Sequence, residues 1–248
     1  MPDPVPEPVG TLAELIRYPI KSMQGERLSR ARVDARGLEY DRLWSVYDAA
    51  GRLGSGKSSR RFVKMQGLLH LTGSVAGDDS APTISWPDGR SLRVDSPAAA
   101  QELSGTLRLP VTVARETAVP HHDDGPVHLV TTASLRWLEG EHGTAAPVAR
   151  FRPNMVLDTG DLLGPVEQGW VGRELVVGQI RLRITAPMPR CVMTTMDQLH
   201  LPADREMLHT LSAHADLDFG VVADVLAPGE LHVGDAASLV PGALRDGS

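Results

Sequence analysis

The sequence of 248 residues contains a single cysteine, Cys191. One cysteine excludes a disulfide within the chain, a four-thiolate iron–sulfur cluster and a zinc site made from several cysteines. Aromatic residues make up only 4% of the sequence, so rings that could stack on nucleic-acid bases are scarce. The net charge is -6, and lysine and arginine are scattered rather than gathered in a basic block. We therefore expect no nucleic-acid partner.

Long apolar runs are also missing from the sequence. No stretch approaches the roughly 18 uncharged apolar residues of a transmembrane helix. The first nine residues, MPDPVPEPV, contain four prolines and have neither the basic start nor the apolar run of a signal peptide. We therefore expect a cytoplasmic protein without a membrane partner, whose residues 1–9 form a disordered tail.

Short apolar or alternating stretches separated by turn residues run through most of the chain. Leu43–Tyr47 and Gln179–Thr185 are two examples, and each is typical of a strand. Helix signals are few and predict three helices, at 96–103, 131–140 and 207–215. Frequent short strands with few helices favour barrels or sandwiches over a doubly wound sheet. The polar, proline-containing stretch 116–126 predicts a domain boundary.

Residues 51–58 read GRLGSGKS and match the phosphate-loop pattern G-x-x-x-x-G-K-S. A phosphate loop requires a buried strand before the first glycine and a helix after the serine. Here the polar turn Asp48–Ala50 precedes the motif, and Ser59–Phe62 is a poor helix start. These flanks favour a hairpin tip over a nucleotide-hydrolysing site. The glycines, Lys57 and Arg61 can still face an anion.

Two other polar motifs leave alternatives open. The run His121-His122-Asp123-Asp124 contains metal-binding side chains, but neighbours on an extended chain point to opposite faces and rarely converge on one ion. A solvated loop is the favoured interpretation. Arg152, within RFRPN at 150–154, either forks onto a phosphate or carboxylate or forms a surface salt bridge.

Cys191 lies in the segment APMPRCVMTTMD at 186–197. One interpretation is a small buried hydrophobe. The adjacent Arg190 favours a functional thiol, because a neighbouring cation stabilises a thiolate. The prolines and the threonine-rich run also describe a polar loop after a strand, where functional residues concentrate. Such a thiol could be a nucleophile, a persulfide carrier or a ligand for a soft metal.

These motifs occur together in one family. The chain resembles the MOSC proteins, named for the C-terminal domain of molybdenum cofactor sulfurase, and more closely the group that contains the mitochondrial amidoxime-reducing component and its bacterial relatives. The motifs that carry the resemblance follow one another in the same order. They are YPIKS at 18–22, GL and then DRLW within 37–44, LVTTASL at 129–135, RFRPN at 150–154, PRC and then TTMD within 189–197, and a closing GD at 234–235.

The resemblance implies a mostly β (α+β) fold of two interlocked barrel-like domains with a few short helices. An N-terminal MOSC-associated β domain would span 10–118 and a MOSC domain 119–244, with a molybdenum–molybdopterin cofactor in the cleft between them. By position, Cys191 would be the thiolate on molybdenum. The pterin and its phosphate would be held by Lys21, Ser22, Arg42, Ser55, Lys57, Arg61, Thr131, Thr132, Arg152, Asn154 and Arg190.

Ser55 and Lys57 depart from the family pattern, and the role of Asp197 is open. The family hairpin usually carries a threonine and an arginine, where this chain has Ser55 and Lys57. Thr131 and Thr132 lie at an expected helix start, where free N–H groups suit an anion. Asp197 either relays protons as a second catalytic residue or caps a turn.

The activity implied by the resemblance is molybdenum-dependent reduction of a small N-hydroxylated or sulfur-containing substrate. The electrons would come from a separate donor protein, because the chain has too few cysteines for an iron–sulfur cluster and no flavin or dinucleotide fingerprint. Two alternatives remain open. Cys191 could carry sulfur as a persulfide in a sulfur-transfer protein, or the chain could carry the cofactor without turnover.

Overall fold

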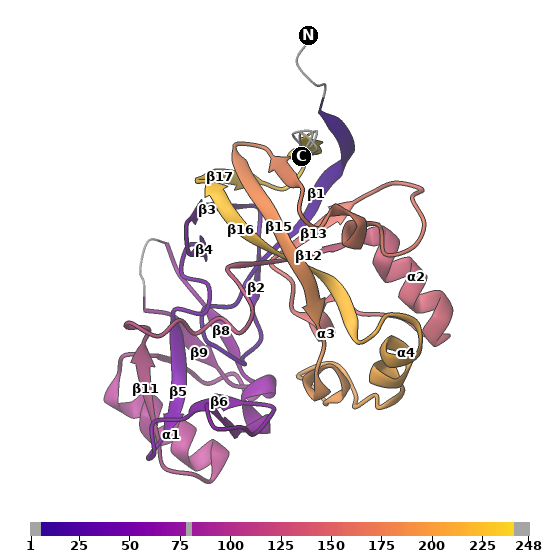
Figure 1. Ribbon diagram of the computed structural model, residues 1–248. Helices are drawn as coiled ribbons and strands as arrows, with labels where there is room; N and C mark the ends of the chain where they lie inside the picture. The colour runs from indigo at the N-terminus through magenta and orange to yellow at the C-terminus, as the bar shows by residue number, and fades with distance from the viewer. Residues whose placement is uncertain (1–5, 78–80, 241–248) are drawn as a thin grey trace.

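The computed structural model describes residues 6–77 and 81–240, and most of its regular structure is β-strand. Seven strands close into a barrel, because the two strands at its seam, β13 (Met155–Asp158) and β1 (Glu7–Arg17), also pair with each other (Figure 1). The strands between them, in spatial order from β13, are β12 (Val127–Thr131), β16 (Asp218–Ala227), β15 (Ile180–Pro189), β14 (Glu174–Val177) and β18 (Ala236–Val240). The expected mostly β, barrel-based fold is confirmed.

Strand β1 brings the start of the chain into a barrel whose other strands all come from residues after 126. Glu7 pairs with Leu239, and Thr11 pairs with residues of both β18 and β13. Gly10 is needed in this strand, because its φ is +146° and a Cβ there would lie 2.0 Å from the Asp158 carbonyl oxygen. The expected disordered tail is corrected at residues 7–9, whose backbone is paired in a strand. Residues 1–5 of that tail lie outside the described residues.

The barrel interior is apolar because its strands alternate. Along β15, Ile180, Leu182 and Ile184 are buried, while Arg181 and Arg183 are exposed. Successive side chains of a strand point to opposite faces, so the sequence IRLRI places three branched apolar side chains inside. Each fully buried side chain of this size contributes about 1.5–3 kcal/mol. The alternation therefore fixes which face of β15 forms the core.

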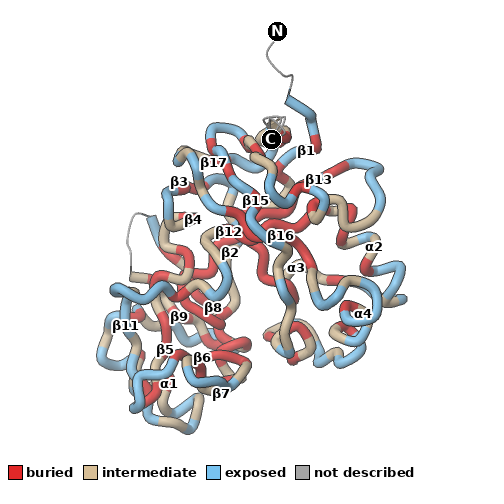
Figure 2. The backbone as a smooth tube through the Cα atoms, viewed as in Figure 1, coloured by how far each residue is buried: buried red, intermediate tan, exposed pale blue. Residues whose placement is uncertain are grey.

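The described part of the N-terminal half is built from smaller sheets, one α-helix and the short 3-10 helix η1 (Gln66–His70). One sheet has the order β11 (Val111–Arg115), β5 (Trp44–Asp48), β6 (Leu53–Ser55) and β7 (Phe62–Lys64). A second has the order β10 (Ser91–Arg93), β9 (Thr83–Ser85) and β8 (Thr72–Ser74). Helix α1 (Pro97–Leu107) begins as predicted after Ser96, whose hydroxyl accepts the Ala99 N–H at 3.3 Å. Figure 2 shows buried positions gathered separately in this half and in the barrel.

Two further pairings interlock the halves. A third small sheet joins β17 (Gly229–His232), near the end of the chain, to β3 (Arg30–Asp34) and β4 (Gly37–Leu38). Strand β2 (Glu26–Leu28) extends the barrel sheet beyond β1. The linker between β11 and β12, which contains the expected domain boundary, crosses between the halves over residues 116–126.

The segment 51–58 does not form a phosphate loop, and only its first residues belong to a hairpin, because β6 pairs antiparallel with β5 but parallel with β7. Strand β5 before it pairs antiparallel with β6, which lies inside the motif itself. In the described chain the next element after Ser58 is strand β7 rather than a helix. The nucleotide-hydrolysing interpretation is therefore wrong, because the motif lacks the strand–loop–helix order that aims backbone N–H groups at phosphates.

Helices pack beside the barrel on the side away from the N-terminal half (Figure 1). The predicted helices near 131 and 207 are α2 (Thr132–His142) and α4 (Glu206–His214). Between them lies α3 (Val148–Phe151), which the sequence analysis missed. Phe151 and Phe219 pack their rings 4.3 Å apart in the core under these helices. Among the described residues, no helix is long and apolar enough to cross a membrane.

Candidate anion-binding site

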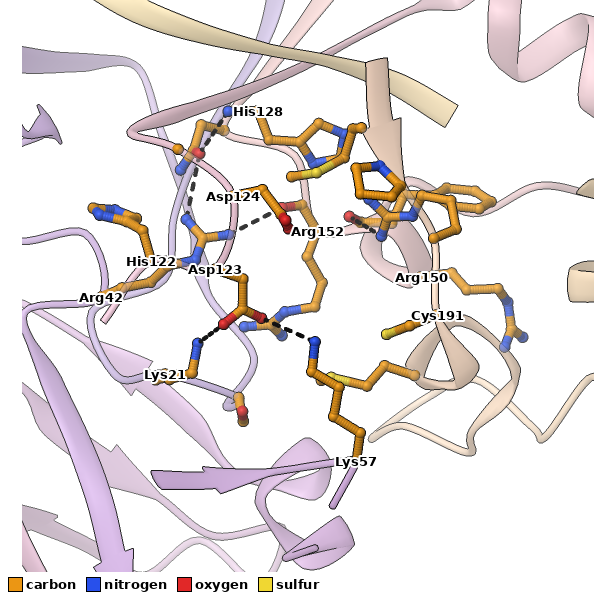
Figure 3. Close-up of a pocket in the computed structure, with 18 residues that line it drawn as sticks. Lys21, Arg42, Lys57, His122, Asp123, Asp124, His128, Arg150, Arg152 and Cys191 are labelled. Atoms are coloured by element: carbon orange, nitrogen blue, oxygen red, sulfur yellow. Dashed lines mark hydrogen bonds and ion pairs between the residues drawn. The ribbon is translucent and has the colours of Figure 1, made fainter. Parts of the chain in front are cut away.

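A pocket of about 220 Å³ lies between the barrel and the N-terminal half. The loop after β1, the loop between β6 and β7 and linker residues 122–125 form one side, and the end of β15 with the segment after α3 forms the other (Figure 3). Eight of the thirteen site residues expected from the sequence line it: Lys21, Ser22, Arg42, Lys57, Arg152, Asn154, Arg190 and Cys191. Motifs distant in the sequence thus meet at one place.

The pocket concentrates positive charge in a chain whose net charge is -6. Six cationic residues and two aspartates line it, namely Lys21, Arg42, Lys57, Arg150, Arg152, Arg190, Asp123 and Asp124. Like charges held this close repel one another, and walls of low dielectric focus their field into the pocket. The pocket therefore attracts anions.

Aromatic rings support these cations, although the chain has only three phenylalanines and three tyrosines. The Phe62 ring centroid lies 4.9 Å from Lys57 Nζ and 5.2 Å from Lys21 Nζ. The buried Tyr18 ring lies 4.4 Å from the guanidinium carbon of Arg152. A ring face attracts a cation without neutralising it. The rings therefore hold several cations close together while leaving their charge available.

Strained backbone also concentrates here. Ser22, Arg42 and Arg152 have φ values of 67°, 49° and 56°, in the left-handed region that glycine normally occupies. This conformation costs a residue with a Cβ roughly 1–2 kcal/mol, and such strain clusters at functional sites. The Ser22 hydroxyl donates to the Gly54 carbonyl oxygen at 3.0 Å, and Arg152 caps the end of α3. The fold thus holds three lining residues in costly conformations.

Three buried arginine nitrogens of the pocket lack acceptors among the described residues, namely Nε of Arg150 and one nitrogen each of Arg152 and Arg190. Arg152 is 9% exposed, and its Nη1 has no hydrogen-bond partner in the part of the chain that the structure describes. Within the same described residues Nε of Arg190 is likewise unpartnered, while its Nη2 donates to the Phe151 carbonyl oxygen at 2.8 Å. Burial lowers the pKa of Arg152 and that of Arg190 to about 10, so both stay charged at neutral pH. Unpaired buried donors each cost about 1–3 kcal/mol, which an anionic ligand would offset.

Lys21 is the most deeply buried lysine of the pocket, with 5% exposure. Its Nζ donates to the His121 carbonyl oxygen and to Asp123 Oδ1, both at 2.7 Å. Burial lowers the pKa of Lys21 to about 8, although the Asp123 carboxylate acts in the opposite direction. Lys57 Nζ approaches the other carboxylate oxygen, Asp123 Oδ2, at 3.8 Å. Asp123 therefore neutralises part of the N-terminal side of the pocket.

Asn154 and Arg42 tie the pocket to the barrel. The Asn154 Oδ1 accepts the His128 N–H at 3.2 Å and Arg42 Nη1 at 3.3 Å, and its Nδ2 donates to the Ile16 carbonyl oxygen at 3.2 Å. Arg42 Nη2 also donates to the Arg152 carbonyl oxygen at 3.2 Å. The amide of Asn154 is thus engaged within the protein and orients Arg42.

Cys191 lies where strand β15 leaves the barrel. The pairing of β15 with β16 shifts register beyond Ile184, and such bulges bend a strand and re-aim its side chains. The Arg190 N–H donates to the Leu217 carbonyl oxygen at 2.6 Å, and the Cys191 carbonyl oxygen accepts the Thr194 N–H at 3.0 Å. The thiol is free and half-buried, and it faces the pocket (Figure 3). The backbone on both sides of the cysteine is therefore fixed.

Thr131 and Thr132 start helix α2 as expected but do not line the pocket. The Thr131 hydroxyl donates to Glu167 Oε2 at 2.7 Å and accepts the Ser134 N–H at 3.1 Å. The Thr132 hydroxyl donates to Asp158 Oδ1 at 3.2 Å. The positive end of the helix is already matched by the buried Glu167 carboxylate. The structure therefore moves both threonines out of the candidate site.

Ser55 and Arg61 adjoin the pocket without lining it. Ser55 is fully buried, with Oγ 3.6 Å from the sulfur of Met193. Arg61 donates to the carbonyl oxygens of Pro120 and His122. Arg61 thus holds the linker that forms one wall, instead of facing the pocket as expected from the sequence.

Asp197 points away from the pocket. Its Oδ1 accepts from Gln66 Nε2 at 2.6 Å, and its Oδ2 lies 3.0 Å from His70 Nε2. The 3-10 turn η3 (Val192–Thr195) reverses the chain between Cys191 and Asp197, which turns the carboxylate toward the N-terminal half. The position of Asp197 gives a proton relay into the pocket no support.

Residues that were not assigned to the site complete the lining, and His122, Asp123, Asp124, His128 and Arg150 are the ionisable ones. The histidine–aspartate run at 121–124 could have indicated three of these lining residues. Its side chains point to different partners, as expected for neighbours on an extended chain. Among the described residues, no three metal-binding side chains converge. Buried Arg150 donates through Nη1 to the Thr194 carbonyl oxygen at 2.9 Å. Its role is to fix the turn after the cysteine.

Comparison with known proteins gives two family matches that follow this architecture. Residues 9–122 match the model described as "MOSC N-terminal beta barrel domain" and residues 116–238 match "MOSC domain". Mitochondrial amidoxime-reducing component 1 of Mus musculus is 24% identical, over 94% of this chain and 83% of that protein. The Homo sapiens protein of the same name is 25% identical over the same shares.

Two other similarities concern part of the chain or the fold alone. Molybdenum cofactor sulfurase of Drosophila grimshawi is 26% identical, over 75% of this chain and 28% of that protein. The crystal structure of the YuaD protein from Bacillus subtilis aligns with a TM-score of 0.51 at 13% identity and covers 94% of each chain. Since the two family matches together run from residue 9 to residue 238, the chain belongs to the MOSC domain family, in the form that carries an N-terminal MOSC β-barrel domain.

Proposed function

We propose that this chain is a molybdenum-cofactor-binding oxidoreductase that reduces small N-hydroxylated compounds with electrons from a separate donor protein. The observation that carries the proposal is the meeting of a free, fixed thiol with six cationic residues in one pocket. The names of its relatives, amidoxime-reducing components and a molybdenum cofactor sulfurase, support the same class of cofactor. Cytoplasmic location and the domain boundary near 118 stay predictions.

The residues of the pocket fit a phosphate-bearing, sulfur-coordinated cofactor. The unpartnered nitrogens of Arg152 and Arg190 are donors that await an acceptor among the described residues, and guanidinium groups match phosphate oxygens in geometry and charge. Lys21 and Lys57 add charge on the opposite side. A thiolate is a suitable ligand for a soft, sulfur-bound metal. We assign Cys191 to the molybdenum and the four cations to the phosphate end.

When bound, this cofactor supplies a centre that accepts and donates two electrons. The chain itself binds and orients. The hydrogen bonds on both sides of Cys191 hold its backbone at one place, and buried Arg150 anchors the following turn. Fixed positions of this kind lower the reorganisation that a reaction requires.

Metal and pterin analysis tests the cofactor assignment. Protein purified from a host that makes the molybdenum cofactor is expected to hold molybdenum and pterin in stoichiometric amounts. Cys191→Ala is expected to lose the metal, because the protein ligand is removed. Asp197→Asn is the matched control, since its side chain lies beyond the same turn but faces elsewhere. Wild-type protein without molybdenum would contradict the assignment.

Turnover tests the reaction. The loaded protein is expected to reduce an amidoxime with a chemically reduced dye or a reduced donor protein, and to be inactive with NADH alone. Direct reduction by NADH without an added protein would contradict the need for a donor. A loaded protein that is inactive with every electron source would instead be a cofactor carrier.

Sulfur transfer is the second candidate, and the match to molybdenum cofactor sulfurase favours it. In that case the Cys191 thiol would carry a persulfide. Protein without metal that releases sulfur to cyanide, and loses this sulfur in Cys191→Ala, would support sulfur transfer over reduction.

A further inference from the structure

The carboxylate of Asp123 lies between two of the pocket's cations. Its Oδ1 is 2.7 Å from Lys21 Nζ and its Oδ2 is 3.8 Å from Lys57 Nζ (Figure 3). The Asp123 side chain is 31% exposed, whereas that of Lys21 is 6% exposed. The carboxylate thus reaches from the pocket surface toward a buried ammonium and makes contacts of the kind that a phosphate oxygen makes with lysines.

The preceding part of the linker holds Asp123 in this place. Glu116 forms two hydrogen bonds with Arg36, at 2.7 and 2.8 Å. The ring of buried His121 contacts the Tyr47 hydroxyl at 2.6 Å and the Arg42 carbonyl oxygen at 3.0 Å. With the backbone fixed two residues earlier, the Asp123 side chain can leave the lysines by rotation while the linker stays bound.

The next residue provides a contrast. Asp124 lines the same pocket, yet among the described residues it forms no ion pair or hydrogen bond. The two carboxyl groups respond oppositely to their surroundings. Burial raises the pKa of both, but Lys21 brings the pKa of Asp123 below its ordinary value, whereas the neighbouring Asp123 raises that of Asp124 further. Asp123 is therefore ionised and paired directly with Lys21, while Asp124 acts on the pocket's cations only at longer range.

We propose that Asp123 is an internal competitor for the anionic group of the ligand and sets which anions the pocket accepts. An incoming oxyanion reaches Lys21 and Lys57 only by displacing this carboxylate or by tolerating its charge. A dianionic phosphate group gains more from the surrounding cations than a singly charged carboxylate does, so it can compete where a monoanion cannot. The residue thereby favours phosphate-bearing ligands, and this inference rests on the proposed function only for the identity of the natural ligand.

Inorganic phosphate is the probe that tests the inference on the full chain. Calorimetric titration at neutral pH and low salt, where Lys21 is still mostly charged and a large part of the phosphate is dianionic, gives the affinity directly. Asp123→Asn removes the competing charge and keeps the shape, and is expected to raise phosphate affinity about tenfold, or about 1.4 kcal/mol. The same variant is expected to bind acetate measurably, while the wild type does not.

Asp124→Asn is the matched control, because it removes the same charge from the same wall without releasing a lysine. Its phosphate affinity is expected to rise by less than about threefold. Equal gains in the two variants would mean that only the overall charge matters and would overturn the inference. Unchanged or weaker phosphate binding in Asp123→Asn would also overturn it, because Asp123 would then position Lys21 for the ligand. Asp123→Ser serves as a second variant if the asparagine protein folds poorly.

The outcome is independent of the cofactor assignment. If the wild-type protein holds no molybdenum but Asp123→Asn gains phosphate affinity, the proposed function fails and the inference stands. If molybdenum is bound but the phosphate affinity of Asp123→Asn does not rise, the proposed function stands and the inference fails.

Discussion

Residues in two buried polar regions of this molecule were expected to bind an anion. The two regions differ in whether their buried hydrogen-bond donors already have acceptors within the protein. At the start of α2, the anion is part of the protein. Fully buried Glu167 accepts the hydroxyls of Thr131, at 2.7 Å, and Ser134, at 2.7 and 2.6 Å. The hydroxyls of Thr131 and Ser134 thus have their acceptor within the fold, so the region is closed.

In the pocket between the halves, by contrast, some buried donors have no acceptor within the described protein. Arg152 and Arg190 each keep a buried nitrogen without a partner among the described residues. Backbone strain at Ser22, Arg42 and Arg152 adds to the cost. A fold holds unpaired donors and strained residues where a ligand or reaction needs them. The difference teaches that hydrogen-bond completion, rather than the presence of donors, separates a structural polar cluster from a binding site.

Removing Glu167 should give the largest effect and should act on stability alone. Glu167→Leu leaves the hydroxyls of Thr131 and Ser134 buried without an acceptor, so the free energy of unfolding is expected to fall by about 2–4 kcal/mol. Denaturant unfolding measures this loss. Phosphate affinity is expected to stay unchanged, and a parallel loss of affinity would show that the two regions are coupled.

The pH dependence of stability sharpens the same prediction. Burial raises the pKa of Glu167 despite the hydrogen bonds that act against it. A carboxyl whose pKa is higher in the folded state binds its proton more tightly there, so its contribution is present below the unfolded value and is lost as pH rises through the folded one. Glu167→Gln has no proton to lose. Its unfolding free energy is expected to fall less than that of the wild type between acidic and neutral pH.

Arg152→Leu should produce the reverse pattern. Phosphate affinity is expected to fall by about thirtyfold, as for loss of a charge-assisted hydrogen bond. The free energy of unfolding is expected to stay equal or rise, because a buried cation whose Nη1 has no acceptor among the described residues is replaced by an apolar side chain over Tyr18. Arg136→Leu, which removes a surface arginine that binds the Gly160 carbonyl oxygen, is the control. Strong destabilisation by Arg152→Leu would make that arginine structural.

Local sequence signals predicted what local physics determines. Ser96 and Thr131 cap helices as their hydroxyls indicated, and IRLRI alternates as a strand must. Local signals could not predict the closure of the barrel, because β1 pairs with β13 and β18 from distant parts of the chain. Such contacts depend on the whole tertiary arrangement rather than on the residues of either strand.

The site shows the same division. The family motifs placed eight lining residues together, since those motifs follow one another in the expected order. Thr131 does not line the pocket, because its hydroxyl is bound by Glu167, 36 residues later, and nothing in the local sequence indicates that partner. The sequence analysis treated Asp123 only as part of a polar run. Its position between two cations depends on Lys21 and Lys57, which come from distant parts of the sequence.

The pH dependence of phosphate binding tests whether the charge of Lys21 contributes to phosphate affinity. Burial lowers the pKa of Lys21 to about 8, so this lysine is charged below that pH and becomes neutral above it. Phosphate affinity is therefore expected to fall by up to about tenfold as the pH rises beyond this value. Lys21→Arg, which keeps its charge to much higher pH, should remove most of the fall. An equal fall in both proteins would assign the titration to another group.

The smallest effect is expected at Asp197, which the sequence analysis left open as a proton relay or a turn cap and whose carboxylate does not line the pocket. Its carboxylate contacts Gln66 and His70, at 2.6 and 3.0 Å. Asp197→Asn keeps the acceptor for Gln66 and loses one partly exposed ion pair, so the free energy of unfolding should fall by less than about 1 kcal/mol. Molybdenum content, phosphate affinity and amidoxime turnover should match the wild type. A large loss of turnover at unchanged metal content would restore Asp197 as a proton relay, and would mean that the turn after Cys191 rearranges during the reaction.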